Sequence, residues 1–191
     1  MLAYVFWHRR MSSVQRDSYE EKLIRYHTIL DKSGLSGFKG SLISRISGAP
    51  WMPDDSEAYE EWYLIDGSRV LDDLNEVAVT GSRKEPHDDV AHLARDLRAG
   101  LYQLKIGEAS SVSGNLITWV SKPSGTTYKR FYDEISSYLG DDKTSLWRRQ
   151  MILGPTQEFC ILSREDMKGV PSKFNPNPIK REFIWQSKLN G

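Results

Sequence analysis

The chain has 191 residues, 39% hydrophobic and 27% charged, and its 26 basic and 26 acidic side chains give a formal net charge of zero. A chain of this length can bury a sizeable core, and a balanced charge gives no overall field that would attract nucleic acid. No apolar run approaches the roughly 18 to 20 residues that span a bilayer, so we expect no membrane partner and a cytoplasmic location. A single cysteine, Cys160, excludes an internal disulfide and a CxxC zinc pair, and we expect it to be buried in the core.

The first part of the chain alternates strand and helix patterns. Apolar runs and helical spacing predict, in order, a strand (2–9), a helix ending near Gly34, strands (37–47 and 62–65), helices (about 68–81 and 86–98) and a strand (101–106). If the two consecutive helices (about 68–81 and 86–98) are counted as one helical region, this order is strand–helix–strand–strand–helix–strand, the split unit of ferredoxin-like folds.

The second part repeats this order less completely. We predict a strand (116–122), a helix (about 128–139), strands (146–153 and 158–162), at most a short helix (164–169) and a last strand (182–185). The apolar stripe Tyr19, Leu23, Tyr26 and Leu30 recurs as Tyr128, Tyr132, Ile135 and Leu139. The pattern therefore predicts two halves, 1–107 and a degenerate 115–191, joined by a small polar linker at 108–114.

Two such units in one chain resemble the dimeric α+β-barrel superfamily, including NIPSNAP-like, EthD-like and antibiotic-biosynthesis-monooxygenase-like proteins. The local likeness is a strand, then Lys122-Pro123-Ser124-Gly125, then a helix around Phe131. The resemblance implies an α+β fold of two tandem ferredoxin-like halves, with apposed antiparallel sheets, helices outside and a cavity between the sheets. Tandem halves could satisfy each other's open faces, so either a monomer or a homodimer is expected.

The superfamily also includes tandem haem proteins of the chlorite-dismutase type. The chain has no proximal-histidine motif that can be placed residue by residue, so we expect no cofactor and keep haem as a minor alternative. His87 and His92 are five positions apart and do not share a helix face, so the carboxylates between them could give only a weak metal site, and we predict none.

Strand alternation selects the first candidate site residues. If Val5 and Trp7 face the helices, then His8, Arg10 and, on the repeated strand, Lys122 face the cavity. The opposite choice of face would exchange the two sets. In the functional interpretation a cationic rim binds an anion and His8 is a candidate general base. In the alternative interpretation these basic residues at a strand end are solvated.

Arg148 and Arg149 give the second candidate site. On a strand, neighbouring side chains face opposite ways, so one of the two arginines points inward among apolar residues. It could bind a ligand carboxylate or phosphate, or pair with a buried carboxylate such as Glu61, Asp66 or Glu158. Trp62 completes the predicted ligand-binding set, since aromatic residues either fill cores or line ligand sites. His27 is expected at the edge of the core.

The functional prediction is a protein that binds, and in an extended form of the hypothesis transforms, a small anionic or aromatic organic molecule between the two sheets. The sequence leaves open whether the protein is an enzyme. The alternative is a non-catalytic structural or assembly protein whose aromatic residues fill the same space. The nearest stretch to an RNA-recognition strand, Lys39-Gly40-Ser41-Leu42, lacks the required aromatic residues, so no nucleic-acid partner is expected.

Overall fold

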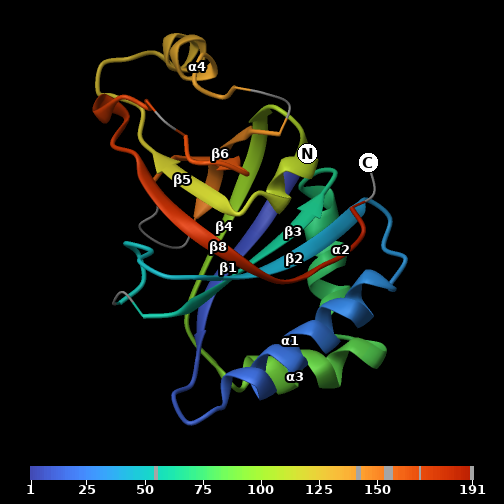
Figure 1. Ribbon diagram of the computed structural model, residues 1–191. Coiled ribbons are helices and arrows are strands. Elements are labelled where there is room, and N and C mark those ends of the chain that lie inside the picture. The colour runs from blue at the N-terminus through green and yellow to red at the C-terminus, as the bar shows by residue number, and fades with distance from the viewer. Residues whose placement is uncertain (54–55, 141–142, 153–156, 168, 190–191) are drawn as a thin grey trace.

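The computed structural model describes the chain except for residues 54–55, 141–142, 153–156, 168 and 190–191 (Figure 1). The described strands are β1 (Leu2–Arg10), β2 (Phe38–Ile46), β3 (Ala58–Ile65), β4 (Ala94–Ile106), β5 (Leu116–Val120), β6 (Ser145–Ile152), β7 (Phe159–Ser163) and β8 (Asn177–Gln186). The α-helices are α1 (Arg16–Asp31), α2 (Arg69–Ala78), α3 (Lys84–Ala91) and α4 (Tyr128–Ser136). No helix in the described part of the chain is both long enough and apolar enough to cross a lipid bilayer.

The strands close into one antiparallel barrel in the order β1-β3-β2-β8-β5-β7-β6-β4. The first half contributes β4-β1-β3-β2 and the second half contributes β8-β5-β7-β6, so both halves have the same internal order. The two sheets join where β2 pairs with β8 and where β4 pairs with β6. The predicted fold class, two tandem ferredoxin-like halves that form a barrel with outer helices, is confirmed.

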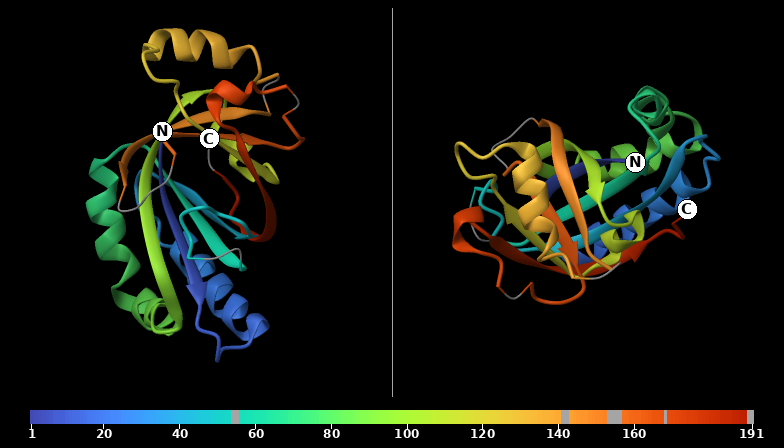
Figure 2. Two further views of the ribbon diagram at one scale, coloured as in Figure 1. Left: turned by 90° about the vertical axis from the view of Figure 1, so that its left-hand side faces the viewer. Right: turned by 90° about the horizontal axis from the view of Figure 1, so that it is seen from above.

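The helices lie outside the barrel and are distributed unequally. Helices α1, α2 and α3 belong to the first half, whereas α4 lies over the second-half strands, away from α1 and α3 (Figures 1 and 2). A 3-10 turn, η3 (Ser172–Phe174), stands in the second half where the first half has α2 and α3. Helix α4 is thus a shorter counterpart of α1, but the closing helical region of the first half has no full counterpart among the described residues.

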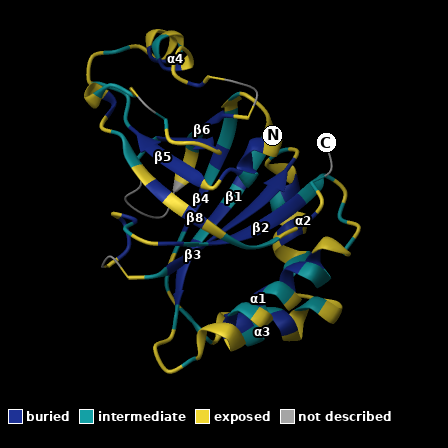
Figure 3. Ribbon diagram, in the orientation of Figure 1, coloured by how far each residue is buried: buried dark blue, intermediate teal, exposed yellow. Residues whose placement is uncertain are grey.

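The barrel interior is filled with aromatic side chains. Trp7, Trp62, Trp119 and Trp147 are fully buried and pack with Trp51 and Tyr102. Strands β3, β5 and β7 are buried along their whole length, as Figure 3 shows for β3 and β5. The ring centroids of Trp7 on β1 and Trp119 on β5 lie 5.7 Å apart. An eight-stranded barrel has an interior just wide enough for such side chains. The predicted cavity between the two sheets is therefore wrong, because that volume is occupied.

The side chains of β1 face the opposite way from the assignment used in the sequence analysis. Val5 and Trp7 point into the barrel, so Phe6 packs with the outer cluster beneath the helices and His8 lies on that same outer face. Alternation along a strand allows only two assignments of side chains to the two faces of the sheet. The one adopted buries the indole ring of Trp7 inside the barrel.

Neighbouring glutamates of β3 follow the same alternation. Glu60 points into the barrel, where its Oε1 lies 2.8 Å from Nε of Arg181 and its Oε2 accepts a hydrogen bond from Nε1 of Trp7 at 2.9 Å. Arg181 also donates to the backbone oxygens of Val112 and Gly114 and is fully buried at the side chain. Glu61 faces outward, towards α1. The charged pair inside the barrel is thus separated from the outer face by the sheet itself.

Several element boundaries differ from the sequence prediction: β3 and β8 begin earlier than expected, and the largest difference lies between α3 and β4. The helix expected at 86–98 ends at Ala91, and residues from Ala94 onward form the start of β4, paired with Arg10 of β1. Long-range strand pairing overrides the local helical spacing there. The described residues of 164–169 form no helix. The predicted end of a strand at Leu153, with the turn Gly154-Pro155, lies outside the described residues.

Candidate functional site

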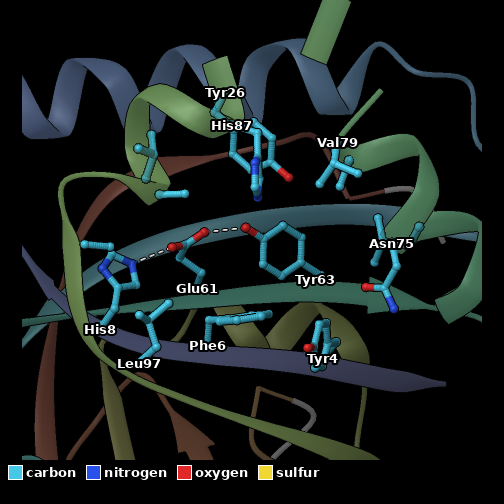
Figure 4. Close-up of a pocket in the computed structure, with 15 residues that line it drawn as sticks. Tyr4, Phe6, His8, Tyr26, Glu61, Tyr63, Asn75, Val79, His87 and Leu97 are labelled. Atoms are coloured by element: carbon cyan, nitrogen blue, oxygen red, sulfur yellow. Dashed lines mark hydrogen bonds and ion pairs between the residues drawn. The ribbon is translucent and has the colours of Figure 1, made fainter. Parts of the chain in front are cut away.

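A cavity of about 170 Å³ lies on the outer face of the first-half sheet, under the helices (Figure 4). Strands β1, β3 and β4 form one wall, and helices α1, α2 and α3 form the other. Its lining residues are Tyr4, Phe6, His8, Tyr26, Glu61, Tyr63, Leu74, Asn75, Ala78, Val79, His87, Val90, Ala91, Ala94 and Leu97. Most of these are apolar or aromatic, and lysine and arginine do not occur among them.

A carboxylate shared by two histidines forms the polar part of the sheet wall. Oε1 of Glu61 accepts from Nε2 of His8 at 2.5 Å, and Oε2 accepts from Nε2 of His27 at 2.6 Å. The hydroxyl of Tyr63 donates to the same Oε2 (Figure 4). All four side chains are buried. One carboxylate therefore accepts three hydrogen bonds, of the four that its lone pairs allow.

The charge state of this network follows from its contacts. Burial alone would raise the pKa of Glu61, but the charges and hydrogen bonds of His8 and His27 outweigh it and hold that pKa below its ordinary value. Burial, reinforced by the Glu61 charge, holds the pKa of Tyr63 well above its ordinary value. Glu61 is thus an anion and Tyr63 a neutral donor, which fits the direction of the hydrogen bond between them.

The outer nitrogens of both histidines are also engaged. The hydroxyl of Tyr19 lies 3.0 Å from Nδ1 of His8, and Oγ of Ser41 lies 2.8 Å from Nδ1 of His27. Burial raises the pKa of Tyr19, so its hydroxyl keeps its proton and can donate to His8. An ionised carboxylate only accepts, so each imidazole donates from Nε2 to Glu61. Both ring nitrogens of His8 are engaged, so neither is free to act as a general base. The geometry instead fits a residue that positions Glu61 and stabilises its ionised form.

His27 is the residue of this network that the sequence analysis placed only at the edge of the core. It is fully buried and shares the α1 stripe with Tyr19, Leu23 and Leu30. A polar residue on an otherwise apolar stripe needs a buried partner, and this pattern is the one sequence feature that indicates a buried polar network at His27. The partner, Glu61, was itself considered only as a counterion for an arginine. No local pattern indicates that His27 and Glu61 meet.

The helix wall carries a second set of polar groups. Tyr26 of α1 and His87 of α3 lie across the cavity from Glu61 and Tyr63, and Asn75 comes from α2 (Figure 4). Val79 and Leu97 also line the cavity although they are 41% and 53% exposed, so they mark its mouth. The entrance is apolar, and the two walls present polar groups to whatever lies between them.

The other predicted site residues lie elsewhere. Trp62 is fully buried in the barrel core, facing away from the cavity. Arg10 ends β1, where Nη1 donates to the backbone oxygen of Val14 at 2.6 Å. Lys122 follows β5, which stands opposite β1 in the eight-strand order. The predicted rim of His8, Arg10 and Lys122 is therefore not formed, because the two repeated strands occupy opposite walls of the barrel.

The second-half cations gather around one exposed tyrosine. Arg148 stacks on the ring of Tyr128 at 3.9 Å, and its Nε lies 3.1 Å from Oε1 of Glu158. Nζ of Lys122 is 5.3 Å from the centre of the same ring. Arg149 lies beside Arg148 on β6 and is partly exposed. For Arg148 the structure shows the ion pair with Glu158 that the sequence left open as an alternative to ligand binding.

The buried network does not fit a metal ion or haem. Two histidines and a carboxylate are a common metal-ligand set, but here both Nε2 atoms point at the carboxylate oxygens and do not converge on a shared point. Within the described residues no group of three His, Cys, Asp or Glu side chains is arranged to hold a metal. A cavity of about 150 Å³ holds one benzene ring, so the space at His8 is too small for a porphyrin.

No known protein-family model matches this sequence, and no curated protein matches it. Solved structures do match. A protein of Fusobacterium nucleatum described as a "putative monooxygenase" superposes with a TM-score of 0.66 and 9% identity, covering 100% of this chain and 95% of the other. The chain has the dimeric α+β-barrel fold.

Two further structures extend this fold-level likeness. A Lactobacillus acidophilus protein, also described as a "putative monooxygenase", has a TM-score of 0.57 and 7% identity, covering 97% of this chain and 95% of its own. A protein described as anthrone oxidase-like has a TM-score of 0.53 and 11% identity, covering 97% and 92%. At such identities the likeness shows the architecture alone. The dimeric α+β barrel is here built within a single chain from its two halves.

Proposed function

We propose that the outer cavity binds a small, uncharged aromatic molecule and that the Glu61 network exchanges a proton with it. The observation that carries this proposal is a buried carboxylate, held by His8 and His27, that opens into an aromatic-walled cavity. Ligand sites typically combine such apolar walls with a few convergent polar groups, and acid–base groups with shifted pKa values gather at functional sites.

The size and charge of the cavity narrow the ligand. Its volume of about 170 Å³ is close to the roughly 150 Å³ that holds one benzene ring, so one ring or a compact two-ring molecule fits. Its walls offer the carboxylate of Glu61 and no lysine or arginine. A carboxylate or phosphate ligand would meet that negative charge without a cation to balance it. Of the two ligand classes predicted from the sequence, we therefore propose the aromatic one.

The network places an anionic acceptor against a bound molecule. Glu61 has one unused acceptor site; because its pKa is held low, it orients a donor and takes a proton only in passing, from an activated group. In an oxidative form of the proposal, proton loss from an activated CH₂ group prepares it for O₂, and the balanced outcome is C=O and water. The monooxygenase and anthrone oxidase-like descriptions of proteins with this fold support that form by analogy only.

Ligand binding tests the proposal directly. Thermal shift and calorimetry with phenol, indole and benzoate should show stabilisation by the first two and none by benzoate, because a ligand that binds only the folded state raises its stability. Ala78→Phe would place a ring in the cavity from α2 and should abolish the effect. Glu76→Phe, on the same helix but outside the cavity, is the matched control. Failure of every uncharged aromatic probe to bind would refute the proposal.

A second candidate function rests on the barrel interior. Its aromatic filling matches the non-catalytic structural or assembly protein considered from the sequence. The two candidates separate in one measurement. Binding of aromatic molecules that Ala78→Phe blocks favours the first, whereas a protein that binds none of them and still folds stably favours the second.

A further inference from the structure

The helix wall of the cavity carries a second titratable side chain, His87, which is not part of the Glu61 network. We propose that His87 accepts a hydrogen bond from the hydroxyl of the aromatic ligand, so that the site selects phenols over aromatic molecules without a hydroxyl. This inference rests on the proposed function, because it names the class of ligand that the same cavity takes.

His87 is placed to meet a ligand held against the sheet wall. It extends from α3 over the cavity, on the side opposite Glu61 and Tyr63 (Figure 4). Its ring packs against Tyr26 with centroids 5.7 Å apart and planes at 67°. The side chain is 34% exposed, so water or ligand can reach it. Among the described residues, Nε2 of His87 has no hydrogen-bond partner, which distinguishes it from both nitrogens of His8.

The neighbouring residues on α3 determine which nitrogen carries the proton. Nδ1 of His87 lies 3.1 Å from Oδ1 of Asp88, whose Oδ2 accepts from Nζ of Lys84 at 2.5 Å. The hydrogen bond from Lys84, with that from His87, holds the pKa of Asp88 below its ordinary value. An ionised carboxylate only accepts, so Nδ1 of His87 must be the donor. In the neutral ring, Nε2 then presents a lone pair.

That lone pair gives the helix wall a preference for a ligand that donates. A bound phenol can place its ring among the apolar lining residues while its hydroxyl points to Nε2 of His87. An aromatic hydrocarbon of the same shape would leave Nε2 without a partner, and removing water from it would cost free energy. An ether, which only accepts, would face Nε2 lone pair to lone pair.

Three probes of similar size test this selection: 4-methylphenol, p-xylene, which replaces the hydroxyl by a methyl group, and 4-methylanisole, which only accepts. We expect the wild-type chain to bind 4-methylphenol about 2- to 12-fold more tightly than p-xylene, the range for one net hydrogen bond. His87→Phe should lower this ratio, because the hydroxyl loses its acceptor on the helix wall. His92→Phe, an exposed histidine at the end of the same helix, should leave it unchanged.

The role of Asp88 has its own readout. Two-bond ¹H–¹⁵N correlation spectra report which imidazole nitrogen is protonated, and His87 should carry its proton on Nδ1. Asp88→Ala removes the acceptor at a partly exposed position, so we expect the proton to move to Nε2 and the preference to shift from 4-methylphenol towards 4-methylanisole.

The outcomes separate the two proposals. If 4-methylphenol and p-xylene bind equally well to the wild-type chain, or if His87→Phe keeps the ratio, His87 does not read the hydroxyl and the inference is overturned while aromatic binding stands. If none of the three probes binds, both proposals are overturned. An Nε2-protonated His87 in the wild-type chain contradicts the assigned tautomer and overturns the inference as well.

Discussion

Replacing Glu61 by glutamine tests whether the shared carboxylate organises the site. The amide oxygen of Gln can still accept from His8, but its NH₂ group would face the donors on His27 and Tyr63. Hydrogen bonds to a buried charge each contribute about 1.5 to 3 kcal/mol, and His27 can recover part of the loss by changing tautomer. We therefore expect Glu61→Gln to lower the free energy of unfolding by about 3 kcal/mol.

The assay is urea unfolding followed by tryptophan fluorescence, with thermal unfolding beside it. A loss of about 3 kcal/mol corresponds to a fall in Tm of about 6 to 12 °C for a chain of this length. Glu158→Gln is the matched control. Glu158 lies next to β7, the second-half counterpart of β3, but it pairs with Arg148 near the surface and its side chain is 24% exposed. Its loss should be at most about 1 kcal/mol. A Glu61→Gln protein within about 0.5 kcal/mol of wild type would refute the reasoning.

The same variant predicts a pH dependence. The folded-state pKa of Glu61 is lowered from its ordinary value of 4.5, so its ionised form stabilises the fold above that value. This stabilisation is lost as the pH falls from 4.5 towards the folded-state pKa. The stability difference between wild type and Glu61→Gln should therefore shrink between about pH 5 and about pH 3. A difference that stays constant over this range contradicts the assigned pKa direction.

Three further predictions concern the rest of the barrel. Arg181→Met should lower the free energy of unfolding by about 3 to 5 kcal/mol, because Glu60 stays buried without its partner, and adding Glu60→Gln should restore part of it in urea unfolding. Burial, with the nearby Glu60 charge, raises the pKa of the Cys160 thiol, so iodoacetamide should label it only on unfolding; rapid labelling of the native chain would contradict this. Gly107→Ala places a Cβ 2.1 Å from a backbone oxygen and should destabilise more than Gly125→Ala, which meets nothing within 4 Å at a similar φ; equal Tm losses would contradict it.

The order of strands and helices could be predicted because each element carries a local signal. The apolar run of β1 and the stripe of α1 are read from neighbouring residues, and the repeat of Tyr19, Leu23, Tyr26 and Leu30 pointed to two halves. The direction in which β1 faces could not be predicted in the same way. Trp7 and Phe6 are both apolar, so alternation alone does not say which of them enters the barrel.

The site was predicted in part. His8 was identified as a candidate, but its partners come from residues far apart in sequence, Glu61 on β3 and Tyr19 on α1. Such contacts depend on strand register and helix docking, neither of which has a local signature. The predicted cationic rim of His8, Arg10 and Lys122 is wrong for a topological reason. The equivalent strands β1 and β5 lie on opposite sides of the closed barrel.

Barrel closure also bears on how the chain folds. Strand β8, near the end of the sequence, fills the gap between β2 and β5, so Ile46 meets Arg181 only when nearly the whole chain is present. Pairings between such distant segments form slowly, and until then β2 and β5 are open edges that can pair with another molecule. Aggregation is therefore most favoured before β8 has docked. Charged residues on this strand, such as Lys180 and Glu182, disfavour its pairing with another molecule.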